Sequence, residues 1–578
     1  MTMKSDSPST SSQDVASLRP GQEKRTPRDE FVKAEADTVM FASARAMHLP
    51  EMITASAVRE ESYRYQIHPR RTWLSRAVLA LILLMQMLLT LRMNNSAFED
   101  EALYLYVGHL EIAHWLHGAA LQGDYPSYFS GAPVLYPVLG AAADSIGGLV
   151  AARAVSLVEM LLATTLVYGM TRRLFNERVA LCAGIVFAAS EPTLFLGNLA
   201  TYDATALLLL TVSAWLVVRT TDFGWPAYLL AAPLMLLAVA TKYATLLFIP
   251  SVIVLAGLAA APRRGGKAAF GRPIALAALF AALCAGLIYV AGPDYMTGFK
   301  FTTLTRFQGT SSTSSLLWDC AQWVGVPLLL ALIGAVANTK KPATEGKGQI
   351  ASAGSSLHRA LLGAVLGGTI LLAPLEQIRI HTETSLFKHV GFGLVIAAPI
   401  VGVGLDRVIG DHFRRIQIGI AVWGVALAVG MTTANNQFNG WPNSALFVSA
   451  MAHYLRPDAR YLVEVDEVPI YYLRNYPDAQ PSQFTSTYYI GYFDNTQGKF
   501  LTGNDGYIAA IKAGYFQVVA YNYSTTPATD GVIARALAQS PLYRLANVIP
   551  NGNDTVRQYI WVKVADFDGI SSDMSGTG

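Results

Sequence analysis

Charged residues are scarce in this chain. Asp, Glu, Lys and Arg make up 14% of its 578 residues, whereas a soluble protein carries about a quarter. Hydrophobic residues make up 52%, and the mean hydropathy is +0.35. This composition excludes an ordinary water-soluble enzyme, because most of the surface must face lipid. The basic residues are dispersed along the chain, so no nucleic-acid-binding surface is predicted.

Cysteine is also rare. Cys182, Cys284 and Cys320 are the three cysteines, and all lie in or beside apolar runs. Their number and placement exclude a disulfide framework and a cysteine-based metal site.

Long apolar runs recur through the middle of the chain, each near the length needed to cross about 30 Å of hydrocarbon. The first run has Arg70, Arg71 and Arg76 at its start and no small-residue cleavage site, which is typical of an uncleaved signal anchor. The hydropathy pattern predicts about eleven spans, at residues 73–93, 147–170, 178–196, 203–219, 226–241, 244–261, 273–292, 320–338, 358–375, 389–405 and 416–434.

The distribution of Lys and Arg predicts the orientation of these spans. Basic clusters occur in every second connection, whereas the stretch 94–152 contains no Lys or Arg at all. Because cytoplasmic loops are enriched in Lys and Arg, the alternation predicts an N-terminus inside and a C-terminus outside.

Three regions follow from composition. Residues 1–68 are polar and are predicted to be a disordered cytoplasmic tail. Residues 69–434 are predicted to form a mainly α, polytopic transmembrane helix bundle. Residues 435–578 alternate β-branched and aromatic residues with helical stretches, as at 504–514 and 530–540, and are predicted to be a small extracytoplasmic α/β domain.

Three adjacent acids, Glu99, Asp100 and Glu101, follow the first span, and Tyr104 comes one turn later. Adjacent like charges raise one another's pKa. A carboxylate at this boundary suits a general base that acts on a membrane-bound substrate. The alternative is a solvated juxtamembrane acid cluster.

The predicted topology brings further polar residues to the same side. Tyr202 and Asp203 begin the fourth span, and cations that suit a lipid-linked phosphate lie near the same boundary. Together, acid and cation fit displacement at a sugar carbon in which an acceptor attacks and a lipid phosphate leaves. The predicted phosphate-binding residues are Lys242, Arg379, Lys388, His389 and Arg153.

Each of these residues also has a plainer interpretation. The plainer interpretation of Lys242 is a lysine that extends its ammonium to the membrane interface. The plainer interpretation of Asp203 is a helix N-cap. Lys388 and His389 are alternatively interfacial anchors, and Arg153 either pairs with an acid or binds phosphate. Their shared side of the membrane favours the functional interpretation.

One cluster of residues has the types found in metal sites but not a full set of ligands. Glu111, His114 and His117 share a helical face, but no further ligand is evident in the sequence. We therefore predict no metal and no cofactor.

Five short motifs suggest a family. They are Asp100-Glu101-Ala102-Leu103-Tyr104, Ala152–Ser156, Tyr168–Phe175, Thr201–Ala204 and Ala240–Tyr243. Their order and spacing resemble the membrane glycosyltransferases with the C-type fold, in particular the protein O-mannosyltransferase superfamily, which includes the bacterial aminoarabinose transferases.

The resemblance implies a polyprenyl-phosphate-sugar donor and catalysis at the outer face of a cell membrane. It implies that Asp100 is the catalytic base with Glu101 beside it, and that Asp203 orients the acceptor or the base. Glu99, Tyr104 and Tyr202 would line the substrate groove. The extra acid Glu99, and Tyr243 where the family commonly has Gly, are departures from the pattern.

The leading hypothesis is therefore an inverting glycosyltransferase whose acceptor is a protein hydroxyl, a glycolipid or a polysaccharide. The alternatives are a transporter or flippase for a lipid-linked saccharide, and a non-catalytic membrane scaffold. A transporter is expected to place ionisable residues near the midplane and to show repeated halves, neither of which is found here.

Overall fold

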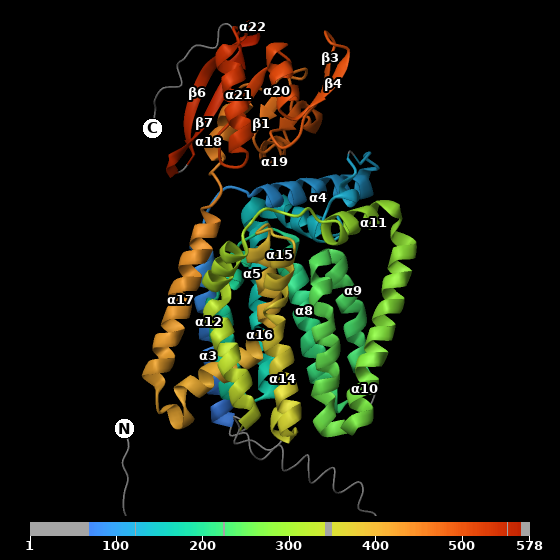
Figure 1. The fold of residues 1–578 in the computed structure, drawn as a ribbon, viewed down its shortest axis with the longest axis vertical. Helices are drawn as coiled ribbons and strands as arrows, with labels where there is room; N and C mark the ends of the chain where they lie inside the picture. Colours follow the sequence, from blue (N-terminus) through green and yellow to red (C-terminus); the bar gives the residue numbers. More distant parts are fainter. Residues whose placement is uncertain (1–68, 122, 224–225, 341–348, 552, 568–578) are drawn as a thin grey trace, which may run out of the picture. The chain divides into compact units, whose positions relative to one another are not determined.

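The computed structural model describes residues 69–121, 123–223, 226–340, 349–551 and 553–567 (Figure 1). The predicted tail 1–68 lies outside the described residues. The helices of the first part are α3 (Pro69–Leu91), α4 (Glu99–His117), α5 (Tyr136–Leu174), α6 (Glu177–Ala189), α7 (Glu191–Leu196), α8 (Tyr202–Arg219), α9 (Ala231–Thr241), α10 (Ile249–Ala291), α11 (Pro293–Phe299), α12 (Thr313–Lys340), α13 (Ile350–Ala353), α14 (Ser356–Thr369), α15 (Leu372–Arg379), α16 (Leu386–Ile409) and α17 (Ile416–Phe438).

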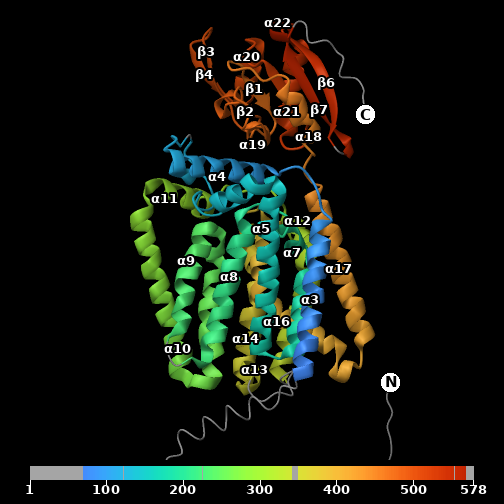
Figure 2. The same ribbon diagram turned by 180° about the vertical axis from the view of Figure 1, so that it is seen from behind.

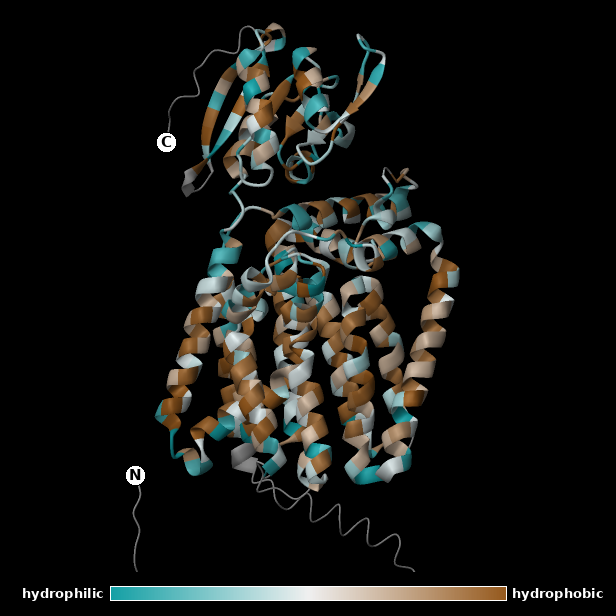
Figure 3. Cartoon of the chain, in the orientation of Figure 1, coloured by the Kyte–Doolittle hydropathy of each residue, from teal (hydrophilic) through white to brown (hydrophobic). Residues whose placement is uncertain are grey.

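Apolar helices form a bundle, and their apolar residues cover its length (Figures 1 and 3). Among the described residues, seven helices are long and apolar enough to cross a membrane, or eight if the bent pair α14–α15 is one span. The chain is thus a multi-pass membrane protein. The predicted number of about eleven spans is not confirmed, because the runs at 178–196 and 226–241 form only short helices.

The helix α10 is two antiparallel helices joined by a turn. Gly265 has a φ of +74°, a left-handed conformation that L residues rarely adopt. A Cβ on Gly257 would lie 2.3 Å from the carbonyl oxygen of Ala269, so the chain folds back on itself. The predicted spans 244–261 and 273–292 correspond to these two halves.

The most buried of the candidate spans is α16. Its glycines allow α12 to approach very closely: a Cβ on Gly404 would lie 1.9 Å from the carbonyl oxygen of Leu330, and a Cβ on Gly334 would lie 2.0 Å from that of Ile400. Small residues at helix contacts are the usual means of tight packing in lipid. The close packing of α16 fixes the position of its first turn, which carries Lys388 and His389.

Residues 445–567, here called the C-terminal α/β region, contain a five-stranded sheet of order β2-β1-β5-β7-β6 and a hairpin, β3-β4. Strands β2, β1 and β5 are parallel, with Tyr461 opposite both Phe484 and Val518, and β7 and β6 are antiparallel. The elements are α18 (Ala445–Ala452), β1 (Tyr461–Val463), α19 (Glu467–Leu473), β2 (Phe484–Ser486), β3 (Gly491–Asp494), β4 (Lys499–Thr502), α20 (Gly503–Lys512), β5 (Val518–Tyr521), α21 (Pro527–Gln539), β6 (Tyr543–Asn551), β7 (Asn553–Lys563) and α22 (Val564–Phe567).

The helix α4 lies across one end of the bundle, beside the C-terminal α/β region (Figures 1 and 2). It contacts α5 on one side and α19 on the other. One helix therefore connects the apolar bundle to the C-terminal α/β region.

Candidate active site

The three acids that begin α4 point in three directions. Successive residues of a helix are rotated by about 100°, so neighbours in sequence need not share partners. Glu99 accepts a hydrogen bond from the Tyr488 hydroxyl of the C-terminal α/β region. Asp100 faces the bundle, and Glu101 is fully buried. The three adjacent acids therefore have different partners and different environments, although they look equivalent in the sequence.

Asp100 pairs with Lys388. The Lys388 ammonium donates to Asp100 Oδ2 at 2.5 Å, and the side chains are 2% and 29% exposed, respectively. Lys388 lies in the first turn of α16, where the helix dipole disfavours a cation. The Asp100 carboxylate offsets that cost, and its remaining exposed surface leaves it open to a substrate.

Asp203 forms a second pair with Lys242, whose ammonium lies 2.6 Å from Asp203 Oδ1. Both side chains are almost completely buried, so Lys242 does not snorkel to the interface. Asp203 is not the helix cap either, because Thr201 precedes α8 and donates its hydroxyl to Asp203 Oδ2 at 2.9 Å. Lys388 also interacts electrostatically with Asp203, so the two pairs form one cluster.

Two tyrosines connect the pairs. The Tyr104 and Tyr202 rings stack with centroids 4.3 Å apart, and their hydroxyls are hydrogen bonded at 2.5 Å. The Tyr104 hydroxyl also reaches Asp100 Oδ1 at 3.3 Å, and Lys242 Nζ lies 4.8 Å from the Tyr202 ring centroid. Two of the three predicted groove residues, Tyr104 and Tyr202, therefore lie in the cluster.

Ser130 belongs to the same cluster, although the sequence did not single it out. Its hydroxyl is hydrogen bonded to that of Tyr202. The loop is held against α9 because the Tyr243 amide donates to the Ser130 carbonyl at 2.8 Å, and a Cβ on Gly131 would lie 1.9 Å from the Thr241 carbonyl. The sequence feature that could have pointed to Ser130 is a Ser-Gly pair in a loop rich in tyrosine.

His389 and Arg306 extend the cluster. His389 is buried next to Lys388, and its Nδ1 lies 3.3 Å from Gln377 Nε2. Arg306 is half-buried, donates to the Thr384 carbonyl at 2.8 Å, and interacts electrostatically with His389 and Tyr202. Burial lowers the pKa of Arg306. Arg306 lies in a long loop, so the sequence does not predict its proximity to His389.

The expected roles of Glu101 and Arg153 need correction. Arg153 donates to both Glu101 oxygens, at 2.8 and 2.7 Å. The same carboxylate accepts the amides of Phe98 and Ala200 at 2.9 and 2.7 Å. Four donors occupy a fully buried carboxylate, so Glu101 has no room for a reacting group. Arg153 correspondingly pairs with an acid and is not available to phosphate.

Arg379 is not brought into the cluster. Its guanidinium pairs with Glu376 at 2.6 Å, and its side chain is 62% exposed. Such an exposed pair contributes little to stability, because water screens it. The predicted phosphate-binding role of Arg379 has no support in this geometry.

The rim of the site toward the C-terminal α/β region is acidic. Burial and the charge of Asp100 raise the pKa of Glu99. Asp466 and Glu467, at the start of α19, are adjacent acids whose pKa values are raised by burial, and that of Glu467 also by the charge of Asp466. Glu467 also interacts electrostatically with Glu99. These three residues, Glu99, Asp466 and Glu467, are here called the rim acids.

Replacing Glu467 by Gln is expected to raise the melting temperature by a few degrees at pH 7.5. The folded state binds the Glu467 proton more tightly than the unfolded state, so this carboxyl destabilises the fold as pH rises above its ordinary pKa of 4.5. The gain should shrink as pH falls and vanish below about pH 4.5, where both states become protonated. Melting curves of the wild type, the Glu467→Gln variant and an exposed Glu383→Gln control at several pH values check this. A pH-independent difference would contradict it.

Glu111, His114 and His117 do not meet around a common point. His114 Nδ1 is hydrogen bonded to the Ala119 carbonyl. Within the described residues, no group of three or more His, Cys, Asp or Glu side chains is arranged to hold a metal ion.

Part of the chain matches a known family profile, and its fold is similar to that of solved structures. Residues 133–291 match the profile described as dolichyl-phosphate-mannose-protein mannosyltransferase. This stretch includes Asp203 and Lys242 but neither Asp100 nor Lys388. No curated protein sequence is significantly similar to the chain.

Several solved structures are similar in fold, two of which follow. ArnT from Cupriavidus metallidurans, bound to undecaprenyl phosphate, has a TM-score of 0.54 at 14% identity, covering 88% of this chain and 99% of that chain. The archaeal oligosaccharyltransferase AglB from Archaeoglobus fulgidus, in complex with an inhibitory peptide and a dolichol-phosphate, has a TM-score of 0.51 at 12% identity, covering 81% and 72%. The profile match and this shared fold confirm the resemblance to the C-type-fold membrane glycosyltransferases of the protein O-mannosyltransferase and aminoarabinose transferase superfamily.

Proposed function

We propose that this protein transfers a sugar from a polyprenyl-phosphate donor to an acceptor hydroxyl or amine, with inversion at the anomeric carbon. The observation that carries the proposal is the pair of carboxylate–lysine contacts, Asp100–Lys388 and Asp203–Lys242, gathered at one end of an apolar bundle. ArnT was solved with undecaprenyl phosphate and AglB with a dolichol-phosphate, which supports a donor of this class.

Asp100 is the proposed general base. It removes the proton from the acceptor as the acceptor oxygen or nitrogen attacks the anomeric carbon. The bond between that carbon and the phosphate oxygen breaks, and its electron pair leaves with the phosphate. The acceptor proton ends on Asp100, and the lipid phosphate gains one negative charge.

The contact between Asp100 and Lys388 couples these two events. While Asp100 is ionised, it neutralises the Lys388 ammonium at 2.5 Å. Once Asp100 takes up the acceptor proton, Lys388 has no neighbouring anion at that oxygen, and its charge is directed to the departing phosphate. Positive charge is thus supplied as negative charge develops, which is the condition for transition-state stabilisation.

We place the reaction on the extracytoplasmic side of the cell membrane, in line with the positive-inside pattern. The clustered residues lie at helix ends: Asp203 in the first turn of α8, Lys242 directly after α9, and Lys388 in the first turn of α16. A transporter for a lipid-linked saccharide would place such charges near the midplane. The end position favours chemistry at the membrane surface.

A donor assay tests the function directly. The purified protein in lipid nanodiscs is incubated with mannosyl, glucosyl, arabinosyl and aminoarabinosyl polyprenyl phosphates, and free polyprenyl phosphate is measured. We expect at least one donor to be cleaved, with the new glycosidic bond opposite in configuration to the donor bond. Retained configuration would contradict the inverting mechanism, and no cleavage of any donor would favour a transporter or scaffold.

Arg306 extends the cluster, and its guanidinium is proposed to bind the donor phosphate. Replacing Arg306 by Gln is therefore expected to raise the donor KM about tenfold while kcat changes little. This corresponds to about 1.4 kcal/mol, in the range of a single hydrogen bond to a charged group. The matched control is Arg379→Gln, which removes a second arginine from the same side of the bundle and should leave KM unchanged. The opposite ranking of the two variants would assign the donor phosphate to Arg379.

A further inference from the structure

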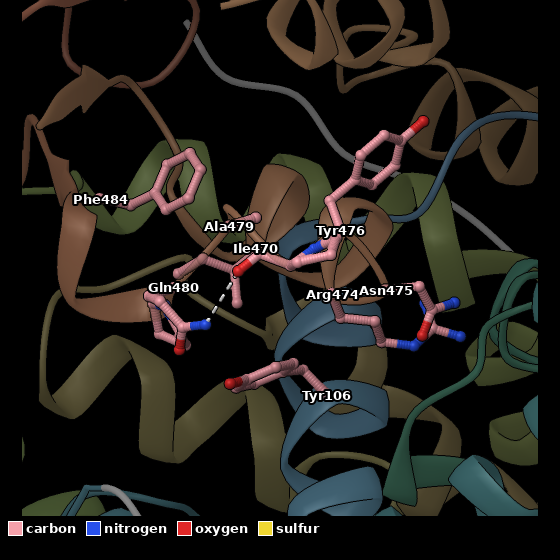
Figure 4. Close-up of a pocket in the computed structure, with 10 residues that line it drawn as sticks. Tyr106, Ile470, Arg474, Asn475, Tyr476, Ala479, Gln480 and Phe484 are labelled. Carbon is pink, nitrogen blue, oxygen red and sulfur yellow. Dashed lines mark hydrogen bonds between the residues drawn. The ribbon is translucent and has the colours of Figure 1, made fainter. Parts of the chain in front are cut away.

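A cavity of about 240 Å³ lies between α4 and the segment that connects α19 to β2 (Figure 4). Tyr106 projects into it from α4, and the remaining lining comes from the C-terminal α/β region. We infer that this cavity binds a neutral, hydroxyl-rich saccharide of the acceptor, at a subsite beyond the transferred sugar. The inference rests on the proposed function and specifies its acceptor class.

The position of Tyr106 connects the cavity to the catalytic centre. Glu99 and Tyr106 are seven residues apart, so they lie on the same face of α4. That face meets the C-terminal α/β region at both residues, through Tyr488 at Glu99 and through the cavity at Tyr106. Tyr106 lies about 9 Å along the helix axis from Asp100, and its side chain is rotated by about 120° from that of Asp100, which faces the bundle. A chain of sugars bound in the cavity would therefore run along the face of α4 toward Glu99, which directly precedes the proposed base in the sequence.

The lining combines a flat aromatic surface with uncharged hydrogen-bonding groups. Tyr106 supplies a half-buried ring, whereas the Phe484 ring packs against Tyr461 and the Tyr476 ring points away from Tyr106 (Figure 4). Asn475 and Gln480 supply amides, of which the Gln480 amide also donates to the Pro477 carbonyl at 3.4 Å (Figure 4). A sugar presents an apolar face of C–H groups and a rim of hydroxyls that donate and accept. These lining groups match both features.

The charges disfavour an anionic acceptor. Arg474 is the one charged side chain among the described residues that line the cavity. Its guanidinium already donates to Asp144 at 2.7 Å and to the Tyr471 carbonyl at 2.7 Å. The rim acids also supply no positive charge that would attract a phosphate or carboxylate. A neutral saccharide needs no such charge.

The pKa of Tyr106 is consistent with this environment. Burial raises the pKa of its phenol to about 12, so the hydroxyl stays protonated and donates a hydrogen bond at any physiological pH.

Direct binding tests the inference without any donor. The full-length protein in nanodiscs is titrated with neutral tetrasaccharides of mannose, glucose, galactose or arabinose, with a bis-phosphorylated glucosamine disaccharide, and with a short Ser/Thr-rich peptide. We expect at least one neutral tetrasaccharide to bind. Tyr106→Ala and the double variant Asn475→Ala/Gln480→Ala should each weaken that binding about tenfold or more, about 1.4 kcal/mol.

The matched control is Asn495→Ala/Gln497→Ala, which removes the same two amides from the turn between β3 and β4 and should bind like the wild type. Three results would overturn the inference: no neutral saccharide binds, the cavity variants bind like the wild type, or the phosphorylated disaccharide or the peptide binds more tightly through the same residues. A failure of the proposed function is distinguishable, because it would abolish polyprenyl phosphate release in the donor assay while leaving saccharide binding measurable.

Discussion

Replacing Asp100 by Asn is expected to lower kcat by about 10²–10⁴-fold, the usual contribution of a positioned general base. Asparagine keeps the size of the side chain and can still accept a hydrogen bond from Lys388, but it cannot take up the acceptor proton. Asparagine stays neutral throughout the reaction. The positive charge of Lys388 is therefore no longer redirected from residue 100 to the leaving phosphate as the acceptor attacks. Release of polyprenyl phosphate from the donor, measured with purified protein, checks this.

The neighbouring acid provides the control for Asp100. Glu99→Gln removes a carboxylate from the adjacent position, but Glu99 faces Tyr488 and not Lys388. We expect this variant to keep most of its kcat. Binding of polyprenyl phosphate and the melting temperature should be close to wild type in both variants. If Asp100→Asn retained more than a tenth of wild-type turnover, another group would have to be the base.

Replacing Arg153 by Met is expected to destabilise the protein by about 3–5 kcal/mol, the cost of breaking a buried ion pair by removing one partner. The Glu101 carboxylate would be left charged and fully buried. The segment between α3 and α4 would also lose two contacts, because Arg153 donates to the carbonyls of Asn95 and Ser96 at 2.9 and 3.1 Å. Expression yield and melting temperature measure the effect.

A double variant separates the cost of the buried Glu101 charge from the cost of losing the Arg153 side chain. In Glu101→Gln/Arg153→Met no charge is buried, and the amide oxygen can still accept one of the two backbone hydrogen bonds that Phe98 and Ala200 donate to different oxygens of Glu101. We expect this double variant to recover part of the lost stability. Arg379→Met, which breaks an exposed pair, should not change the melting temperature. A stable Arg153→Met protein that fails to bind polyprenyl phosphate would restore the phosphate-binding role of Arg153.

The order of the apolar segments and much of the site were predictable from the sequence. Hydropathy locates the bundle, and charge bias in the loops predicts which helix ends share a side. On that basis Asp100, Asp203, Lys242 and Lys388 were expected together, and they form two adjacent ion pairs. The number of spans was harder to predict, because hydropathy does not separate a long helix from the short helices α6 and α9.

The errors have a common physical cause. Glu101 was assigned with Asp100 because the two are adjacent in sequence, but a helix turns its neighbours about 100° apart. The partner of Glu101 is Arg153, fifty-two residues away, and no local pattern predicts that contact. Arg379 was assigned from its side of the membrane alone, and topology does not tell whether a side chain points into the cluster or into solvent.

The position of a bound lipid phosphate tests the central claim most directly. A cryo-EM structure of the full chain with a polyprenyl phosphate should place the phosphate within hydrogen-bond distance of Lys388 or Lys242, at the end of the bundle where Asp100 lies. A phosphate bound at the opposite end, near Arg172 and Arg173 in the last turn of α5, would contradict the proposed active site.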